Sequence, residues 1–557
     1  MNLAVGRSHC EPVLHECTAS ALAGLQLELP ELREYTYGFF GQLAELIGAE
    51  IAPIVPQLLP RLLETINNED TISFDSPEEK EGGLKAVARA LSKGVTNDDG
   101  PCDGDGEGEE EESEEEDDDS DDDDGGPTLS IRTALLDEKA SAAHCISELA
   151  KHAGAAFAPH IDACMPPMLN ATGYFHPDVR GASTRALGRL LVASAKAEGI
   201  PPWQKGQMLG PDALPPHTKE RYYGKVMDAL IETFSKDDDK DTVAAASEAL
   251  SEVALAMGPA AILPHAPALV VVTIKLLKQK HPCFLEEDDG GGGDDGIDHD
   301  ADHDGAMWES VSELLTNLPK VLGSAWCIHF AKLKPALLPY LSAGHPAGDR
   351  SLAIGILAES MHQLEGAGSS FFKDIYPLAM RCINDEDNTA RQNATFCLGV
   401  LGQHGGAEAL HAMQDLLSAL QPRLAPTEED QSVRDNAVGA LARLVLAFGA
   451  TLPLASIVPA IMTHLPLRAD PGENLPSVRC LMRAAQDEAA RVHLAPHMQQ
   501  LLKVLGELMT PAALVEKSNG PPPLATEELQ NEIKEFLAWL IGVAPEMRAS
   551  LPPELLL

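Results

Sequence analysis

This chain of 557 residues has few aromatic residues, no closely spaced pair of cysteines and no apolar run long enough to span a membrane. Aromatics make up only 4% of the sequence, and its apolar positions fall mostly in segments of 12 to 20 residues, which favours helices over strands. The ten cysteines stand singly, without a Cys-x-x-Cys pair, and no secretory signal is recognisable. This pattern predicts reduced, mostly buried thiols in an intracellular protein.

Signals for a membrane span, an enzyme or a cofactor are also lacking. The longest apolar run, 262–277, contains two prolines and a histidine and is too short and interrupted to cross a bilayer. No nucleophile elbow, phosphate loop or dinucleotide-binding glycine motif occurs. The segment 298–305 resembles a calcium loop, but neither frame supplies both the central glycine and the final glutamate. We therefore expect no enzyme activity, cofactor, metal or membrane insertion.

Positive charge is heavily outnumbered. There are 41 Lys and Arg against 86 Asp and Glu, and the net charge is −45. Residues 98–124 hold 19 acidic residues in 27 and no Lys or Arg, and a second acidic segment occupies 285–305. Nucleic acid is a poor partner for such a chain, because phosphate binding needs clustered Lys and Arg. The charge favours a basic protein partner instead.

A repeat of about 42 residues organises the rest of the chain. Four segments align on one arginine and are apolar at positions 7 and 10 counted from it. Positions 3, 7 and 10 lie on one helical face, so each segment is predicted to form an amphipathic helix. Position eight is small, so that a neighbouring backbone can come close. Weaker copies align on Lys139, Val243, Trp308 and Arg350, and the clearest intervals are 41 to 43 residues. The four aligning arginines are Arg33, Arg180, Arg391 and Arg434. A fixed period of this size is typical of a solenoid of helix pairs.

Each copy is preceded by a proline-containing segment that we expect to form the second helix of the pair, for example 157–172. Asp387 and Asp430 lie four residues before an aligned arginine, where a carboxylate either caps the helix or meets the arginine of a neighbouring repeat. The arginines themselves either bind a ligand or join stacked repeats. We expect the structural role, an Asp–Arg ladder.

The fold class expected from these features is an all-α, right-handed superhelical solenoid with acidic loop insertions. Repeats occupy 1–97, 128–284 and 306–557, with a Pro/Gly loop at 199–219. An acidic disordered insertion fills 98–127, and an acidic Gly/Asp-rich loop fills 285–305. Two interpretations of the acidic insertion stay open: a solvated loop that keeps the protein soluble, or a flexible electrostatic clamp or decoy for a basic protein. Its candidate binding residues are Glu109, Glu110, Glu111, Glu112, Glu114, Glu115, Glu116, Asp117, Asp118, Asp119, Asp121, Asp122, Asp123 and Asp124.

An ordered series of segments resembles a known family. PELREYTYGFFGQLAELIG (30–48), HPDVRGASTRALGRL (176–190), DNTARQNATFCLGVLGQHGG (387–406) and VRDNAVGALARLV (433–445) are similar to repeats of the importin-beta (karyopherin-beta) superfamily. The resemblance implies a HEAT-repeat, armadillo-type solenoid, and it matches the C-terminal half of such receptors. The main Ran-binding helices of the family are therefore expected to be absent.

The resemblance also implies a function. Members carry basic cargo such as histones and ribosomal proteins through the nuclear pore, contact nucleoporin FG repeats and release cargo to the Ran GTPase. They shuttle between cytoplasm and nucleus. Two alternatives remain at this stage: a HEAT scaffold subunit of a multiprotein complex, and an acidic histone chaperone. A carrier or chaperone that acts through charge should lose affinity as salt rises, whereas a scaffold should not.

Overall fold

The computed structural model describes residues 7–27, 29–68, 72–73, 130–131, 133–284, 300–510 and 523–555. The acidic insertion, with its candidate residues from Glu109 to Asp124, lies outside the described residues, and so do residues 285–299. Contacts divide the chain into two compact units. The first holds Asn2–Ala193 with Leu285–Ile297, and the second holds Ser194–Phe284 and Asp298–Leu557.

The first unit consists of helices and one minimal strand pair. In it, α3 packs along α6, and α4 lies against both α6 and α7. Its elements are α2 (Arg7–Gly24), α3 (Pro30–Ile47), η1 (Gly48–Ile51), α4 (Val55–Asn67), β1 (Ile72–Ser73), β2 (Ser130–Ile131), α6 (Thr133–His152), η2 (Gly154–His160), α7 (Ile161–Ala171) and α8 (Pro177–Glu198). The two strands are antiparallel, with Ile72 opposite Ile131. The boundary with the second unit falls inside α8.

The second unit has two layers of helices. The long-helix layer is α11 (Lys240–Met257), α14 (Asp300–Leu322), α16 (Ala347–Leu364), α18 (Asn388–His404), α21 (Gln431–Phe448), α23 (Asn474–Gln486) and α27 (Glu527–Val543). The short-helix layer is α10 (Gly224–Lys236), α13 (Ala266–Leu277), α15 (Cys327–Leu337), α17 (Phe372–Cys382), α20 (Met413–Leu420), α22 (Leu454–His464) and α25 (Met498–Leu508).

Short helices and turns join the layers. They are η3 (Pro211–Ala213), α9 (Pro216–Thr218), the π-helical η4 (Lys219–Tyr223), α12 (Pro259–Ile262), η5 (Leu263–His265), η6 (Pro282–Phe284), η7 (Gly323–Trp326), η8 (Leu338–Leu341), η9 (Glu365–Phe371), α19 (Gly406–His411), η10 (Gln421–Leu424), η11 (Gly449–Thr451), η12 (Pro471–Glu473), α24 (Glu488–Leu494), η13 (Ala495–His497), η14 (Pro545–Ser550) and η15 (Pro553–Leu555).

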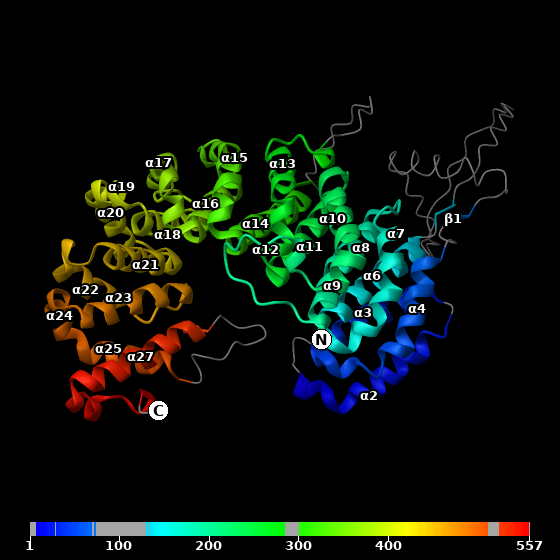
Figure 1. The fold of residues 1–557 in the computed structure, drawn as a ribbon, viewed down its shortest axis with the longest axis horizontal. Coiled ribbons are helices and arrows are strands. Elements are labelled where there is room, and N and C mark those ends of the chain that lie inside the picture. The colour runs from blue at the N-terminus through cyan, green and yellow to red at the C-terminus, as the bar shows by residue number, and fades with distance from the viewer. Residues whose placement is uncertain are drawn as a thin grey trace, which may run out of the picture. The chain divides into compact units, whose positions relative to one another are not determined.

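Each long helix packs on the next one along the chain, from α11 through α14, α16, α18 and α21 to α23. Short helices such as α13, α15 and α17 cover one side of this layer (Figure 1). Every repeat therefore buries its apolar face against its neighbours rather than against a single central core. The expected all-α HEAT-repeat solenoid is confirmed.

Gly399 shows why position eight of the repeat must be small. A Cβ atom on Gly399 would lie 2.7 Å from Cα and 2.8 Å from Cβ of Ala440. The backbones of α18 and α21 therefore touch at this point, and a side chain on Gly399 would separate them. At this repeat the predicted close approach is confirmed.

Helix ends follow local chemistry. The Asp387 side chain accepts a hydrogen bond from the Ala390 amide, and Asp430 accepts one from Val433, so both aspartates are N-caps, each contributing about 1 kcal/mol. At their C-terminal ends, α11 and α21 stop at a left-handed glycine, Gly258 or Gly449. The helix α16 instead stops at Glu365, which holds φ 52° and ψ −135°, a sparsely populated conformation that costs a residue with a side chain roughly 1–3 kcal/mol.

Two element boundaries differ from the sequence-based expectation. The segment 157–172 is a 3-10 turn up to His160 and only then the helix α7, because Pro159 lacks the N–H that would continue an α-helix. The helix α14 begins at Asp300, so the last residues of the expected acidic loop 285–305 are helical.

The stretch Pro259–Phe284 is long and apolar enough, with a mean hydropathy of 1.8, to pass a criterion for a membrane span. In the structure it is broken into α12, η5, α13 and η6. The helix α13 packs against α10 and α15, and Leu269, Thr273 and Leu276 on it are fully buried. This is the arrangement of a core helix in a layered protein.

Candidate functional site

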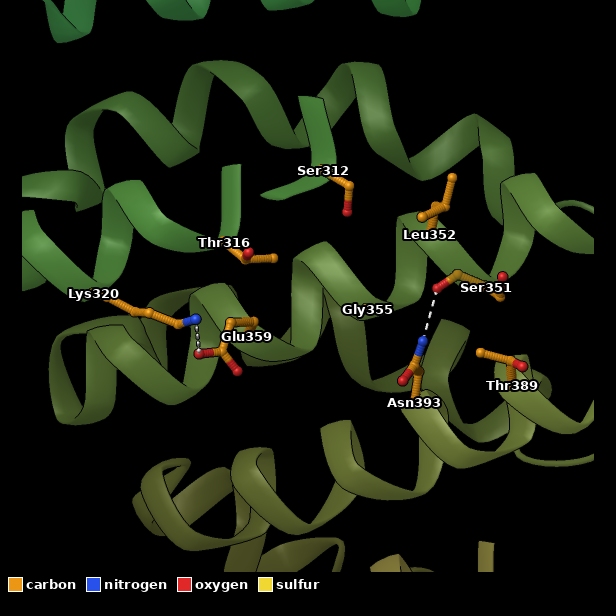
Figure 2. Close-up of a pocket in the computed structure, with 9 residues that line it drawn as sticks. All are labelled: Ser312, Thr316, Lys320, Ser351, Leu352, Gly355, Glu359, Thr389 and Asn393. Carbon is orange, nitrogen blue, oxygen red and sulfur yellow. Dashed lines mark hydrogen bonds and ion pairs between the residues drawn. The ribbon is translucent and has the colours of Figure 1, made fainter. Parts of the chain in front are cut away.

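A polar groove of about 290 Å³ crosses three consecutive long helices in the second unit. Figure 2 shows its side chains on α14, α16 and α18 converging on one open face. The lining residues are Ser312, Thr316 and Lys320 of α14, Ser351, Leu352, Gly355 and Glu359 of α16, and Thr389 and Asn393 of α18. Hydroxyl, amide, carboxylate and ammonium groups together can bind an extended polar chain.

Helical spacing places these groups in a row. Ser351, Gly355 and Glu359 are four residues apart on α16 and therefore share one face of the helix. A Cβ atom on Gly355 would lie 3.0 Å from the Asn393 side-chain nitrogen. Glycine at this position thus lets Asn393 rest against α16, where its Nδ2 donates to the Ser351 carbonyl oxygen at 2.9 Å. That bond orients the Asn393 amide and leaves its oxygen to accept from a ligand.

Glu359 is the carboxylate of the groove, with a side chain 22% exposed. Its Oε1 accepts a hydrogen bond from Gln363 Nε2 at 2.9 Å. Lys320 Nζ lies 4.0 Å from the same oxygen (Figure 2), but it donates to Asn317 Oδ1 at the shorter distance of 3.1 Å. Glu359 is therefore only loosely paired, and it remains able to accept a ligand ammonium or guanidinium.

Further carboxylates continue from the groove toward α11. Glu313, exposed on α14, accepts from Asn317 Nδ2 at 3.3 Å. Ser310 of the same helix donates to Glu248 of α11 at 3.2 Å, and Glu252 follows Glu248 one helical turn later. Negative charge thus follows the polar row beyond the groove, and a positively charged ligand is favoured along it.

Histidines add little positive charge near this face. Burial, followed by the nearby Arg443 guanidinium, lowers the pKa of His362, which also lies edge-on to the ring of Phe396. Burial likewise lowers the pKa of His404. Both imidazoles are therefore uncharged at neutral pH.

Arg391 is one of the aligned arginines whose side chain reaches the next repeat. Arg391 donates to the carbonyl oxygens of Asp385 and Glu386 at 2.8 and 2.9 Å and reaches Glu428 of the next repeat at 3.3 Å. Arg350, in the preceding repeat, binds Asp385 through two nitrogens at 2.9 and 2.7 Å. Arginine thus joins stacked repeats, but its carboxylate partners lie two residues before the capping aspartates.

The other aligned arginines make different contacts. Arg180 donates to the carbonyl oxygens of Tyr174 and Phe175 at 3.3 and 2.9 Å. Arg33 donates to the Leu27 carbonyl oxygen at 3.0 Å and lies 3.7 Å from Glu138 of α6. Arg434 lies near His464, and the pKa of that imidazole is lowered by burial and by the positive charge of Arg434. Asp387 and Asp430 point back to their own helix termini, since each accepts from an amide three residues on.

Sequence reasoning did not name the groove residues. The signal was present as a stripe of small and polar residues, Ser351, Gly355, Glu359 and Gln363, at four-residue intervals on α16. Such a stripe is common on surface helices and does not by itself predict a groove. The groove is formed only where α14, α16 and α18 lie side by side.

The chain is similar in sequence to several known proteins. No protein-family model matches the chain. In sequence it is similar to a probable importin subunit beta-4 of Schizosaccharomyces pombe, 23% identical over 98% of this chain and 48% of that protein. It is also similar to importin-4 of Mus musculus and of Homo sapiens, 28% identical to each over 93% and 92% of this chain. The chain spans slightly less than half the length of these relatives.

Solved structures agree at the level of the fold. Crystal structures of the karyopherin Kap121p, one bound to the SUMO protease Ulp1p and one bound to RanGTP, match with TM-scores of 0.62 and 0.61. The sequence identities are 14% and 15%, and each match covers 96% of this chain and 47% of the other. At such identities the likeness shows a shared architecture of stacked repeats.

Proposed function

We propose that this chain, which is similar in sequence to importin-4 proteins along nearly its whole length, binds basic protein cargo as part of a nuclear import receptor. Histones and ribosomal proteins are the proposed cargo classes. Transport through the pore would further require contact with nucleoporin FG repeats and release under Ran control. The protein would then shuttle between cytoplasm and nucleus and would not act as an enzyme.

The observation that supports this proposal most directly is the groove over α14, α16 and α18. It combines a loosely paired carboxylate, Glu359, with the oriented amide of Asn393 and a continuing row of glutamates on α11 and α14. The carboxylates would attract the lysine and arginine side chains of a cargo segment, while the amide and hydroxyl groups would bind its backbone. Each exposed charge pair contributes little alone, so affinity has to come from several pairs along one segment.

A peptide-binding experiment tests the groove. We expect a lysine-rich histone-tail peptide to bind the full chain at least about tenfold more tightly than a neutral peptide of equal length, and to lose that advantage between about 0.05 and 0.5 M salt. Glu359→Gln should weaken the basic peptide about three- to tenfold, because one attractive pair is lost. Fluorescence anisotropy measures both effects.

The matched control is Glu232→Gln on α10, which removes the same charge from the short-helix layer. It should leave the affinity within about twofold, since a distant surface charge acts only through the screened net field. Equal effects of the two substitutions would contradict a role for the groove. Tight, salt-insensitive binding of a non-basic partner would favour a scaffold instead.

The acidic insertion at 98–124 is a second proposed cargo contact. Its 19 acidic residues would attract the positive charges of a bound basic segment. Replacing residues 98–124 with a neutral Gly/Ser linker of equal length should lower the affinity for the basic peptide and reduce its salt dependence, because up to 19 carboxylates are lost. An increased affinity would show that the insertion is a decoy that competes with cargo.

Transport itself is tested separately. A basic reporter protein should accumulate in the nuclei of permeabilised cells when a receptor containing this chain is added, and accumulation should depend on Ran. Binding without accumulation would indicate a histone chaperone rather than a carrier.

A further inference from the structure

The connection between α8 and α9, residues 199–215, is more than a surface loop. In Figure 1 it runs as a long irregular segment beside α12 and α14. The Gly206 amide donates to the Val321 carbonyl oxygen in the last turn of α14 at 3.0 Å, and Lys205 reaches the end of α16. We call residues 199–215 the strap. It contacts the C-terminal ends of three long helices that are far apart in sequence.

The strap packs closely against the residues that follow α11 and α14. A Cβ atom on Gly258, at the end of α11, would lie 2.4 Å from the ring of Trp203. A Cβ atom on Gly323, just after α14, would lie 3.0 Å from Lys205 Cγ and 3.2 Å from Gly206 Cα. Both glycines have positive φ, 71° and 49°. The strap therefore occupies a defined position rather than one of many loop conformations.

The Lys205 ammonium lies next to two side-chain oxygens at the end of α16. It donates to Glu365 Oε1 at 2.5 Å and to Gln363 Oε1 at 3.4 Å. The hydrogen bond from Lys205 lowers the pKa of the Glu365 carboxyl below its usual value. Gln363 in turn donates to Glu359 of the groove at 2.9 Å. The strap lysine is therefore one side chain away from the groove carboxylate.

Glu365 is itself unusual. The helices α11 and α21 end with a left-handed glycine, but α16 has a glutamate with φ 52° at the equivalent place. A residue with a side chain is unfavourable in this conformation, but the carboxylate makes an interaction that glycine could not make. The interaction observed is with Lys205. Because the two side chains are 37% and 57% exposed, water and salt screen their attraction, and an external ammonium can replace it.

We propose that Glu365, Gln363 and Glu359 form a subsite for a lysine or arginine side chain of a bound basic peptide, and that Lys205 of the strap occupies this subsite from within the chain. The strap thereby lowers the affinity of the groove for basic peptides, and a peptide must displace Lys205 to bind fully. This inference rests on the proposed binding of basic peptides in the groove and adds an internal competitor to it.

The test compares the full chain with two single-lysine variants of equal net charge. Lys205→Ala should bind a lysine-rich peptide about three- to tenfold more tightly than the natural chain at low salt. Lys236→Ala removes an exposed lysine, 71% exposed on α10, and should change the affinity less than about twofold. Adding Glu365→Gln to Lys205→Ala should abolish the gain, since the freed carboxylate is then missing.

Displacement has a direct readout in the natural chain. When the peptide binds, hydrogen exchange of residues 203–209 should accelerate, because the Gly206 amide loses its bond to the Val321 carbonyl oxygen. If the natural chain binds the basic peptide, but Lys205→Ala gains no more than Lys236→Ala and the strap exchange is unchanged, the internal-competitor proposal is overturned. If no variant prefers the basic peptide to a neutral one, the proposed function itself fails.

Discussion

Replacing Arg443 with methionine should destabilise the α21–α23 region by about 3 to 5 kcal/mol, because it leaves the Glu473 carboxylate buried without its cation. Arg443 and Glu473 are 6% and 5% exposed. One guanidinium nitrogen donates to Glu473 Oε1 at 2.9 Å and the other to Oε2, while the guanidinium also lies 4.8 Å from the Phe396 ring centre. This pair links α18, α21 and η12, so its loss should affect all three.

The destabilisation should also depend on pH in a defined direction. Burial raises the pKa of Glu473, against the opposing effect of Arg443, and without Arg443 this carboxyl should titrate higher still. A carboxyl whose folded-state pKa lies above its unfolded value stabilises the fold at low pH and loses that contribution as pH rises through the folded pKa. Arg443→Met should therefore be less harmful at pH 5 than at pH 8.

Hydrogen exchange of the α21 and α23 amides measures this effect, since a long repeat array need not unfold in one step. The control is the double variant Arg443→Met with Glu473→Leu, which removes both charges and should recover most of the lost stability. A single variant as stable as the natural chain at pH 8 would show that the carboxylate is hydrated or protonated there.

Replacing Gly399 with valine is the second change with a large expected effect, a loss of about 2 to 3 kcal/mol. The clash is with the backbone of α21, because the added Cβ would lie 2.7 Å from Ala440 Cα. A flexible side chain could move aside, but a helix backbone cannot do so without separating from its neighbour. The gain in helix propensity over glycine, under about 1 kcal/mol, is too small to offset this.

Thermal unfolding and hydrogen exchange of α18 and α21 check the expectation. Gly38 in α3 provides the matched control, since no atom lies within 4 Å of a Cβ placed there; Gly38→Val should be close to neutral. Adding Ala440→Gly to Gly399→Val should restore part of the stability by reopening space. Equal stabilities of the two valine variants would mean that α18 and α21 can move apart at little cost.

Much of the architecture could be predicted because it depends on local sequence patterns. The 41- to 43-residue spacing and the apolar face of each aligned segment identified helix pairs in a solenoid, and Asp387 and Asp430 were recognisable as possible caps. The carboxylates that pair with the arginines were not recognisable. Asp385 and Glu428 sit in turns rich in acidic residues, where only the path of the backbone decides which side chain faces the neighbouring repeat.

The sequence by itself determined the helices, their period, the negative charge and the resemblance to a family of transport receptors, because each depends on residues within one helical segment or on composition. The tertiary structure alone decided which residues meet. Asn393 lies against Gly355, Arg443 is buried with Glu473, and Lys205 reaches Glu365 across 160 positions of the chain. Such pairs depend on how far each helix is rotated about its axis and on where a long connection turns. Many side-chain contacts set both together, and no local pattern records them.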